Sequence, residues 1–305
     1  MEHILTTKQF LDKKILEQIF RSADLMERMD KKGKVPKYLE GKILATLFYE
    51  PSTRTRFSFE TAMLKLGGQV ITTENAKEFS SAIKGETIED TVRVVGNYTD
   101  AIVLRHYENG TASKASIVSP VPIISAGDGS GEHPTQALLD LYTVKKELGR
   151  LDNLKIGLVG DLLYGRTTHS LIYLLSIFKN INLFFVSPKE LKLPQNCIKF
   201  LKEKKVNFVE TNKLDKVLPK IDVLYATRIQ KERFKSEKLY NKIKDSFKID
   251  GSSLKKMKIK SIIMHPLPRV NEISTEVDYD KRAAYFRQAK NGLYIRMTLL
   301  KMIME

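Results

Sequence analysis

Short apolar runs that are rich in β-branched residues alternate along this chain with longer segments of helical periodicity. The first clear run, GKILATLFYE at 41–50, is apolar almost throughout instead of alternating between apolar and polar residues. A strand of this kind is buried on both faces, as in a parallel sheet that is covered by helices. The pattern therefore predicts an α/β protein in which strands and helices follow one another.

The strand–helix pattern runs through the chain in two successive series. In the first series we expect strands at 41–50, 69–73, 100–106 and 121–127, and helices at 53–66, 86–98 and 133–149. In the second we expect strands at 154–161, 181–188 and 221–228, a strand with its following loop at 260–269, and helices at 166–178 and 283–304. A chain of 305 residues has the length of about two domains.

Two such series predict two domains, each with a central parallel β-sheet flanked by helices, joined by two interdomain helices. We expect 1–135 together with 289–305 to form one domain and 150–284 to form the other. Residues 136–149 are then an interdomain helix.

Composition argues against several classes of protein. Hydrophobic residues make up 42% of the chain, yet no window reaches the ~18 consecutive apolar residues that a membrane span needs. The N-terminal residues MEHILTTKQFLDKK lack the apolar core and cleavage site of a signal peptide. A single cysteine, Cys197, excludes an intrachain disulfide and a cysteine-rich zinc site. We expect a soluble cytoplasmic protein that needs no metal or other cofactor.

The net charge of +16 raises the possibility of a nucleic-acid partner. Only 14 of the 52 basic residues are arginines, however, and the lysines are spread through amphipathic segments. The densest basic region, 235–260, is interleaved with acidic and apolar residues. We therefore expect solvated helix faces that favour small anionic ligands, and no nucleic acid. A nucleic-acid-binding protein is the alternative, and a salt-dependent gel shift would detect it.

Polar and basic residues follow the predicted strands or stand at the start of the next helix. These residues are Arg54, Arg105, His133, Arg166, Arg228 and His265. In an open parallel sheet, ligands bind beyond the carboxyl ends of the strands. The sequence thus predicts anion-binding groups at this edge of both sheets.

The segment 52–56, STRTR, places hydroxyls and arginines where a buried strand turns into a helix. The start of a helix presents unpaired N–H groups and the positive end of the helix dipole. Ser52, Thr53 and Thr55 add hydroxyl donors, and Arg54 adds a planar fork that fits phosphate oxygens. An N-capping serine followed by surface arginines is the alternative, but five such residues in a row favour a phosphate site. It is not a P-loop, because GxxxxGK[ST] is missing.

Two further groups belong to the first series. Arg105 ends a buried strand, where it needs either a bound anion or a salt bridge to a carboxylate. His133 and Gln136 stand one turn apart at the start of a helix. An imidazole there resists protonation and suits a hydrogen bond to a carbonyl oxygen.

The second series opens with GLVGDLLYGRTTHS at 157–170, which resembles a dinucleotide-binding turn. Its glycine spacing is not GxGxxG, and Ser187 stands where a ribose-binding acid is expected, so we exclude a nicotinamide site. Arg166 at a helix start, and Arg228, Gln230 and Arg233 after a strand, remain as anion-binding groups.

The chemistry of these groups is binding and polarisation. The prolines of 264–269, MHPLPR, hold backbone carbonyls outward, where they can accept from an amine. The chain offers neither a nucleophile backed by a base nor a metal cluster. We expect a reaction whose rate comes from positioning and electrostatics.

Taken together, the motifs resemble the catalytic chains of the aspartate carbamoyltransferase family, in order and over nearly the whole chain. The motifs are FYEPSTRTRFSFE, KGET, RH, HPTQALLDL, GDLLYGRTTHSL, TRIQKERF and HPLPRVNEI. The related ornithine enzymes typically have HCLP where this chain has HPLP at 265–268. The resemblance implies carbamoyl transfer from carbamoyl phosphate to L-aspartate, an early step of pyrimidine synthesis. A carbamoyltransferase for another amine is the alternative.

The resemblance also implies residue roles. The implied phosphate ligands are Ser52, Thr53, Arg54, Thr55 and Arg105. Thr55, Arg105 and His133 would polarise the carbamoyl C=O, while Gln136 and the carbonyls of Pro266 and Leu267 would hold its NH2 group. Arg166, Arg228 and Gln230 would bind the carboxylates of aspartate, whose amine would also meet the Leu267 carbonyl. Glu50 is expected to pair with Arg166 and Arg233 when the domains close.

A loop with Ser80 and Lys84 is donated to a neighbouring subunit in that family. This implies a homotrimer with active sites shared between subunits, in which the loop contacts both carbamoyl phosphate and aspartate. Some relatives also bind a separate zinc-bearing regulatory chain. Leu163 and Asn271 depart from the family's usual Lys and Asp at these positions. The second departure leaves allosteric behaviour open.

Overall fold

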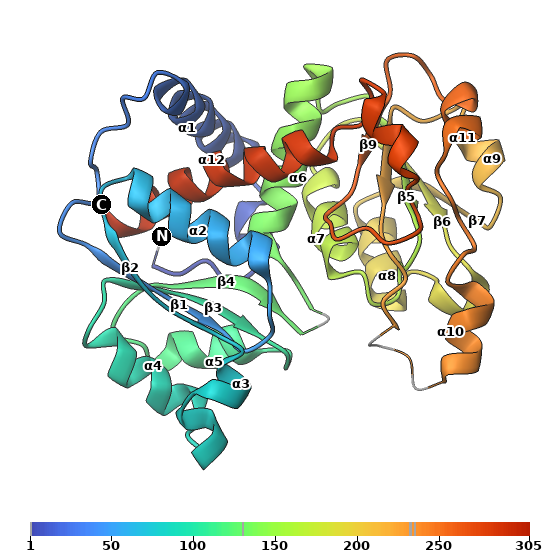
Figure 1. The fold of residues 1–305 in the computed structure, drawn as a ribbon. Coiled ribbons are helices and arrows are strands. Elements are labelled where there is room, and N and C mark those ends of the chain that lie inside the picture. Colours follow the sequence, from blue (N-terminus) through green and yellow to red (C-terminus); the bar gives the residue numbers. More distant parts are fainter. Residues whose placement is uncertain (1, 130, 232–233, 235) are drawn as a thin grey trace. The chain divides into compact units, whose positions relative to one another are not determined.

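The computed structural model describes residues 2–129, 131–231, 234 and 236–305, and its contacts divide the chain into two compact units (Figure 1). The first unit contains the residues up to Leu139 and Lys290–Glu305, and the second contains Asp140–Ala289. Both changes of unit fall inside helices, one in α6 (Pro134–Leu148) and one in α12 (Tyr285–Met304).

The first unit is built on a parallel sheet with the strand order β2-β1-β3-β4. Its strands are β1 (Ile43–Phe48), β2 (Gln69–Glu74), β3 (Ala101–His106) and β4 (Ile123–Asp128). Its helices, besides parts of α6 and α12, are α1 (Lys13–Lys31), α2 (Thr53–Lys65), α3 (Ala76–Phe79), α4 (Ile88–Gly96) and α5 (Thr111–Val118), with the 3-10 turns η1 (Thr7–Phe10) and η2 (Ser81–Lys84). Figure 1 shows α1 and α2 on one face of this sheet and α4 and α5 on the other.

Helices on both faces explain the composition of the central strands. On one face, Ala45 and Leu47 of β1 and Ile102 and Leu104 of β3 join a single buried cluster. Phe48, on the opposite face of β1, is fully buried as well. A strand that is covered on both sides cannot alternate apolar and polar residues, which is what the run at 41–50 predicted.

The second unit has a parallel sheet of five strands in the order β7-β6-β5-β8-β9. The strands are β5 (Lys155–Val159), β6 (Asn182–Val186), β7 (Asn207–Thr211), β8 (Val223–Ala226) and β9 (Ile262–Met264). The helices are α7 (Arg166–Leu175), α8 (Gln195–Glu203), α9 (Leu214–Val217), α10 (Glu237–Ile243) and α11 (Gly251–Lys256), with the 3-10 turns η3 (Lys189–Leu191) and η5 (Thr275–Tyr279).

The fold class predicted from the sequence is confirmed, since both units contain a parallel sheet flanked by helices. The prediction omitted β7 and several helices, namely α1, α3, α5, α8, α9, α10 and α11. β7 is an edge strand with mostly exposed side chains, so it lacks the apolar run that identified its neighbours. α1 does carry an amphipathic signal, because Leu16, Ile19 and Ala23 recur at helical spacing and are buried.

No helix in the described parts of the chain combines the length and the apolar character that crossing a membrane requires.

Candidate active site

Three adjacent strands of the first unit bring predicted site residues to one edge of the sheet. Across the β1–β3 pair Phe48 lies opposite Arg105, and across the β3–β4 pair His106 lies opposite Asp128. The segment 52–55 follows β1, Arg105 lies near the end of β3, and His133 follows β4. The parallel register therefore places all three groups beyond or at the carboxyl ends of the strands, where ligands bind in such sheets.

The predicted phosphate cradle lies at the start of α2. Ser52 holds the N-cap position, but its hydroxyl donates to Thr55 Oγ1 (3.1 Å) and makes no capping bond to the helix backbone. The first N–H groups of the helix are thus not capped by this side chain. Thr55 is buried and Arg54 is exposed to solvent. This arrangement suits an anion at the helix start.

Arg105 is held in a single orientation by three hydrogen bonds. Its Nε donates to the Glu50 carbonyl (3.1 Å), its Nη1 to the Ala126 carbonyl (3.1 Å) and its Nη2 to Glu50 Oε1 (2.8 Å). The ion pair compensates the charge of the buried guanidinium, so the salt bridge that the sequence left as the alternative is present. A role in phosphate binding stays a prediction.

Glu50 pairs with Arg105 because it follows β1, whose neighbour is β3. Tyr49 N donates to the Arg105 carbonyl (2.9 Å), which continues the sheet register past Phe48 and brings the next residue beside the arginine. The expected pairing of Glu50 with Arg166 stays a prediction, and Arg233 lies outside the described residues.

His133 and Gln136 are buried at the start of α6. The His133 carbonyl accepts from the backbone N–H groups of Gln136 (3.0 Å) and Ala137 (3.1 Å), so the histidine begins the first helical turn. Glu132, the preceding residue, accepts from Thr7 N (2.6 Å). The N-terminal segment therefore helps to hold the approach to His133.

Ser80 and Lys84 belong to the short segment that contains α3 and η2. The Ser80 hydroxyl donates to the Ala76 carbonyl (2.5 Å) and accepts from Ala82 N (3.2 Å), which folds the segment onto itself. Lys84 is exposed, as are the neighbouring apolar side chains of Phe79 and Ile83. Exposed apolar residues on a short loop are typical of a surface that contacts another protein.

In the second unit, Asp161 joins the loops that follow two neighbouring strands, β5 and β8. The carboxylate accepts from Tyr164 N (2.9 Å) and from Gln230 Nε2 (3.4 Å), and the same amide donates to the Tyr164 carbonyl (3.2 Å). Asp161 is fully buried, and burial raises its pKa although these hydrogen bonds act in the opposite direction. Gln230 is therefore positioned by the loop that leads to Arg166.

Arg166 and Arg228 stand on these two loops. Arg166 is the first residue of α7, after Gly165 at the N-cap position, and Arg228 follows β8 by two residues. Both side chains are half-buried. Because Val159 at the end of β5 lies opposite Ala226 at the end of β8, both arginines start from the same edge of the sheet.

Pro266 and Leu267 follow β9, which is the next strand along this edge. Leu267 has a φ of 54°, in the left-handed region that leucine seldom adopts. A non-glycine residue in this conformation is held there by its surroundings.

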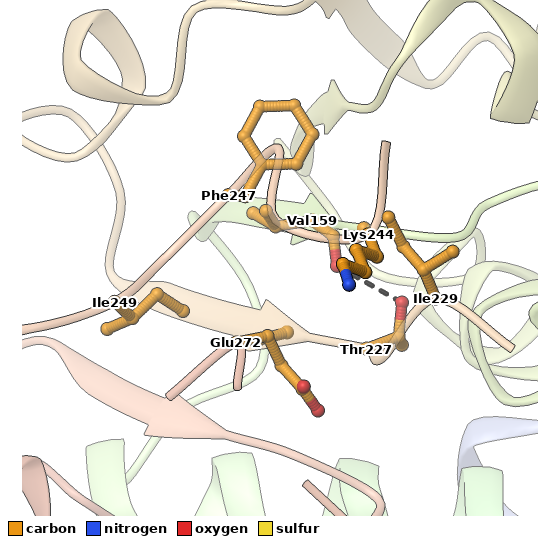
Figure 2. A pocket seen from close by; sticks show the side chains of 9 residues that line it. Val159, Thr227, Ile229, Lys244, Phe247, Ile249 and Glu272 are labelled. Atoms are coloured by element: carbon orange, nitrogen blue, oxygen red, sulfur yellow. Dashed lines mark hydrogen bonds between the residues drawn. The ribbon is translucent and has the colours of Figure 1, made fainter. Parts of the chain in front are cut away.

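A small pocket of the second unit is lined partly by residues of these loops, but not by the site residues predicted on them (Figure 2). It is lined by Val159, Gly160, Ala226, Thr227, Ile229, Lys244, Phe247, Ile249 and Glu272. Figure 2 shows the Thr227 hydroxyl bonded to the Val159 carbonyl, a distance of 3.1 Å, which joins β5 to the exit of β8. None of the lining residues was predicted to bind substrate, so we do not place the active site there.

Two family models match this chain over almost its full length. Residues 2–146 match the carbamoyl-P binding domain of aspartate/ornithine carbamoyltransferase, and residues 152–303 match the Asp/Orn binding domain. The chain belongs to the aspartate/ornithine carbamoyltransferase family.

Named relatives with similar sequences include aspartate carbamoyltransferases. The chain is 53% identical over 305 residues to the aspartate carbamoyltransferase catalytic subunit of Methanocaldococcus jannaschii, covering all of this chain and 98% of that one. It is 52% identical over 305 residues to a chloroplastic aspartate carbamoyltransferase of Pisum sativum, covering all of this chain and 79% of the plant protein.

Solved structures of aspartate carbamoyltransferases superpose closely on this chain. The catalytic subunit of the M. jannaschii enzyme superposes with a TM-score of 0.91 at 53% identity, covering 99% of this chain and 98% of that one. The Trypanosoma cruzi enzyme in complex with carbamoyl phosphate and aspartate superposes with a TM-score of 0.95 at 41% identity, covering 100% and 97%.

Some polar residues of this carbamoyltransferase hold the segments that carry the predicted site residues, but the sequence alone did not identify them. Asp161 was visible only as part of a glycine-containing motif, and nothing in the sequence assigned a role to Glu132 or Glu272. Each becomes informative only through its hydrogen-bond partners: Thr7 for Glu132, Gln230 for Asp161 and the His265 ring for Glu272. The one local signal was the position of Asp161 directly after a buried strand.

No group of three or more histidine, cysteine, aspartate or glutamate side chains arranged to hold a metal ion occurs among the described residues of this carbamoyltransferase.

Proposed function

We propose that this protein transfers the carbamoyl group of carbamoyl phosphate to the α-amine of L-aspartate. The products are N-carbamoyl-L-aspartate and phosphate, and the reaction is an early step of de novo pyrimidine biosynthesis. The observation that carries the proposal is that each unit presents its own set of anion-binding residues at the carboxyl edge of its sheet. Family membership and the aspartate-type relatives support the choice of substrates.

The first unit supplies the groups for carbamoyl phosphate. The phosphate is bound by the start of α2, with Ser52, Thr53, Arg54, Thr55 and Arg105 as its ligands. Thr55, Arg105 and His133 donate hydrogen bonds to the carbamoyl oxygen, and Gln136 accepts from the carbamoyl NH2. Ser80 and Lys84 complete this site from a neighbouring subunit.

The second unit supplies the groups for aspartate. Arg166, Arg228 and Gln230 bind its two carboxylates, with Lys84 of a neighbouring subunit as a further cation. The carbonyls of Pro266 and Leu267 accept from the carbamoyl NH2, and the Leu267 carbonyl also accepts from the aspartate amine. Arginine forks match the planar geometry of carboxylates, which favours a dicarboxylic amine over a cationic one.

The chemical step needs only these groups. The neutral amine of aspartate attacks the carbamoyl carbon, and the C=O electron pair moves onto the oxygen. Donors aimed at that oxygen stabilise its developing charge. The C–O bond to phosphate then breaks, its electron pair leaves with the phosphate, and the ammonium proton passes to the leaving phosphate. The bound substrates thus react through positioning and electrostatics alone.

A substrate comparison tests the proposal directly. We expect purified protein to form N-carbamoyl-L-aspartate from carbamoyl phosphate and L-aspartate, measured together with phosphate release. L-ornithine in place of aspartate should give no citrulline, because the second unit offers arginines and not carboxylates to the amine substrate. Citrulline formation, or no product from either amine, would contradict the assignment.

We further propose that the protein acts as a homotrimer whose subunits share active sites. The first unit exposes apolar side chains on α2, on the edge strand β2 and on the segment around η2: Phe57, Leu64, Ile71, Phe79 and Ile83. Exposed apolar residues near an open sheet edge favour contact with another subunit. A separate zinc-bearing regulatory chain is a second proposed partner, and the single cysteine supports a reducing compartment such as the cytoplasm.

Hybrid trimers test the shared site. Lys84→Ala and Arg228→Ala homotrimers should both be nearly inactive, since every site lacks one group. After the two variants are dissociated and reassembled together, about one site in three of each mixed trimer combines an intact Lys84 loop with an intact Arg228. We expect activity to recover in proportion to the mixed trimers. If mixing restores no activity, Lys84 acts within its own chain or not at all.

A further inference from the structure

His265 links the backbone of the loop after β9 to a half-buried carboxylate. Its ring is almost fully buried, its Nδ1 accepts from Leu267 N (2.8 Å), and its Nε2 lies 2.8 Å from Glu272 Oε1. A ring nitrogen that accepts from a backbone N–H carries no proton of its own. The proton is therefore on Nε2, which donates it to Glu272, and the ring connects the carboxylate to the Leu267 peptide.

Glu272 also accepts hydrogen bonds from the backbone of the same loop. Its second oxygen accepts from Val270 N and Asn271 N, at 3.1 Å each. Burial tends to raise the pKa of Glu272, but the hydrogen bonds from His265 and from the backbone outweigh it, so that its pKa lies below the ordinary value. The carboxylate is thus ionised at neutral pH and acts as a fixed acceptor under the loop.

The backbone of His265 is anchored independently of its ring. His265 N donates to Gln288 Oε1 (2.9 Å), and Gln288 Nε2 donates to Asp140 Oδ1 (2.6 Å). Tyr225 in β8 donates to the other oxygen of Asp140 (2.6 Å). Gln288, Asp140 and Tyr225 are all buried, so the chain of bonds ties the start of the loop to α12, α6 and β8.

Leu267 lies between the part of the loop bound by Gln288 and the part bound by Glu272, and its backbone conformation is an unfavourable one. Leu267 has a φ of 54°, and the bond from its N–H to His265 opposes its return to the extended region. Gln288 fixes one end of the loop and Glu272 fixes the other. The backbone conformation of Leu267 between them therefore depends on the His265 ring.

We propose that Glu272 and His265 form a positioning pair that holds Leu267 in its left-handed backbone conformation, so that the Leu267 carbonyl keeps the orientation it needs to accept from the substrate amines. The inference rests on the proposed function, since it concerns the carbonyl assigned there to the carbamoyl NH2 and the aspartate amine. Neither side chain of the pair needs to touch substrate.

The Glu272→Gln variant tests the pair. Glutamine keeps the size of the side chain but presents an NH2 group to either the His265 Nε2–H or the two backbone N–H groups, so one set of bonds is lost. We expect kcat to fall about 10-fold and the KM for aspartate to rise about 10-fold, a change on the scale of one charge-assisted hydrogen bond in each. Binding of inorganic phosphate, which involves the first unit alone, should change by less than about 2-fold.

Two substitutions of His265 separate its two bonds. Asparagine places an acceptor near the position of Nδ1 and keeps the bond from Leu267 N, whereas glutamine reaches toward Glu272 and loses it. If the pair acts through Leu267, His265→Asn retains more activity than His265→Gln. The opposite order would overturn the proposal. Thermal unfolding of both variants checks that the comparison is made on folded protein.

Glu276→Gln is the matched control. Glu276 is also a carboxylate of the second unit that accepts from a backbone N–H, that of Gly251 (2.8 Å), but it lies in η5. Its substitution should leave kcat and both KM values unchanged. If Glu272→Gln has the same kinetics as Glu276→Gln, the positioning role of His265 and Glu272 is refuted and the proposed function is not. If the wild-type protein makes no carbamoylaspartate, the proposed function itself is refuted.

Discussion

Replacing Arg54 with alanine is expected to lower carbamoylaspartate formation at least ~100-fold while the protein stays folded. Arg54 is assigned to the transferring phosphate, where negative charge builds as the C–O bond breaks. Removing one donor from such a charge costs roughly 3–4 kcal/mol of transition-state stabilisation, which corresponds to a rate loss of this size. Steady-state kinetics with both substrates varied would show the loss in kcat as well as in kcat/KM for carbamoyl phosphate.

The fold should tolerate this substitution because Arg54 is exposed in the first turn of α2. Exposed substitutions of this kind change the free energy of unfolding by about 0.5 kcal/mol or less. Arg21→Ala is the matched control, since Arg21 is an exposed arginine on α1 of the same unit. Near-normal turnover of Arg54→Ala, or an equal loss in Arg21→Ala, would refute the assigned role.

Replacing Arg228 with alanine is expected to reduce kcat/KM for aspartate at least ~100-fold, mainly through KM. A paired arginine–carboxylate contact contains two charge-assisted hydrogen bonds, each stronger than a neutral one, and their joint loss amounts to about 3 kcal/mol. The binding of inorganic phosphate should stay within about 2-fold of the wild-type value, because the phosphate ligands belong to the first unit. Equilibrium binding of phosphate and initial rates at varied aspartate concentration measure the two effects separately.

Arg150→Ala serves as the control for Arg228. Arg150 belongs to the same unit and is about half exposed, but it stands beside Asp222, near the start of β8 and away from its carboxyl end. A purely electrostatic effect of lowering the net charge would affect both variants alike. If Arg228→Ala weakens phosphate binding as strongly as it weakens aspartate, the assignment of this arginine to aspartate is wrong.

Many of the elements were predictable because their cause is local. The run at 41–50 is apolar on both faces, and β1 is indeed covered by helices on both faces. The segment 52–56 predicted the start of a helix, and α2 begins at Thr53. β7 escaped prediction because its burial depends on a single neighbour, β6, which its own residues do not reveal.

The positions of the proposed site residues in the fold were predictable to the extent that each follows a strand. Arg105 shows the limit of that approach, since its position predicted an anion or a carboxylate and only the register of β1 against β3 identified Glu50. The partner of Gln230 lies on another loop, and the partners of His265 lie within its own irregular loop, where no helical or strand periodicity relates the residues.

By itself the sequence determined the α/β architecture, the positions of the strand exits and the residue types that stand there, because periodicity and helix-start chemistry act over a few neighbouring residues. Only the tertiary structure decided which polar groups are satisfied by which partners. Hydrogen bonds between Asp161 and Gln230 (3.4 Å), or between His265 and Glu272 (2.8 Å), form because sheet order and loop path bring their atoms together. This condition depends on the path of the chain through the unit and not on periodicity or helix-start chemistry.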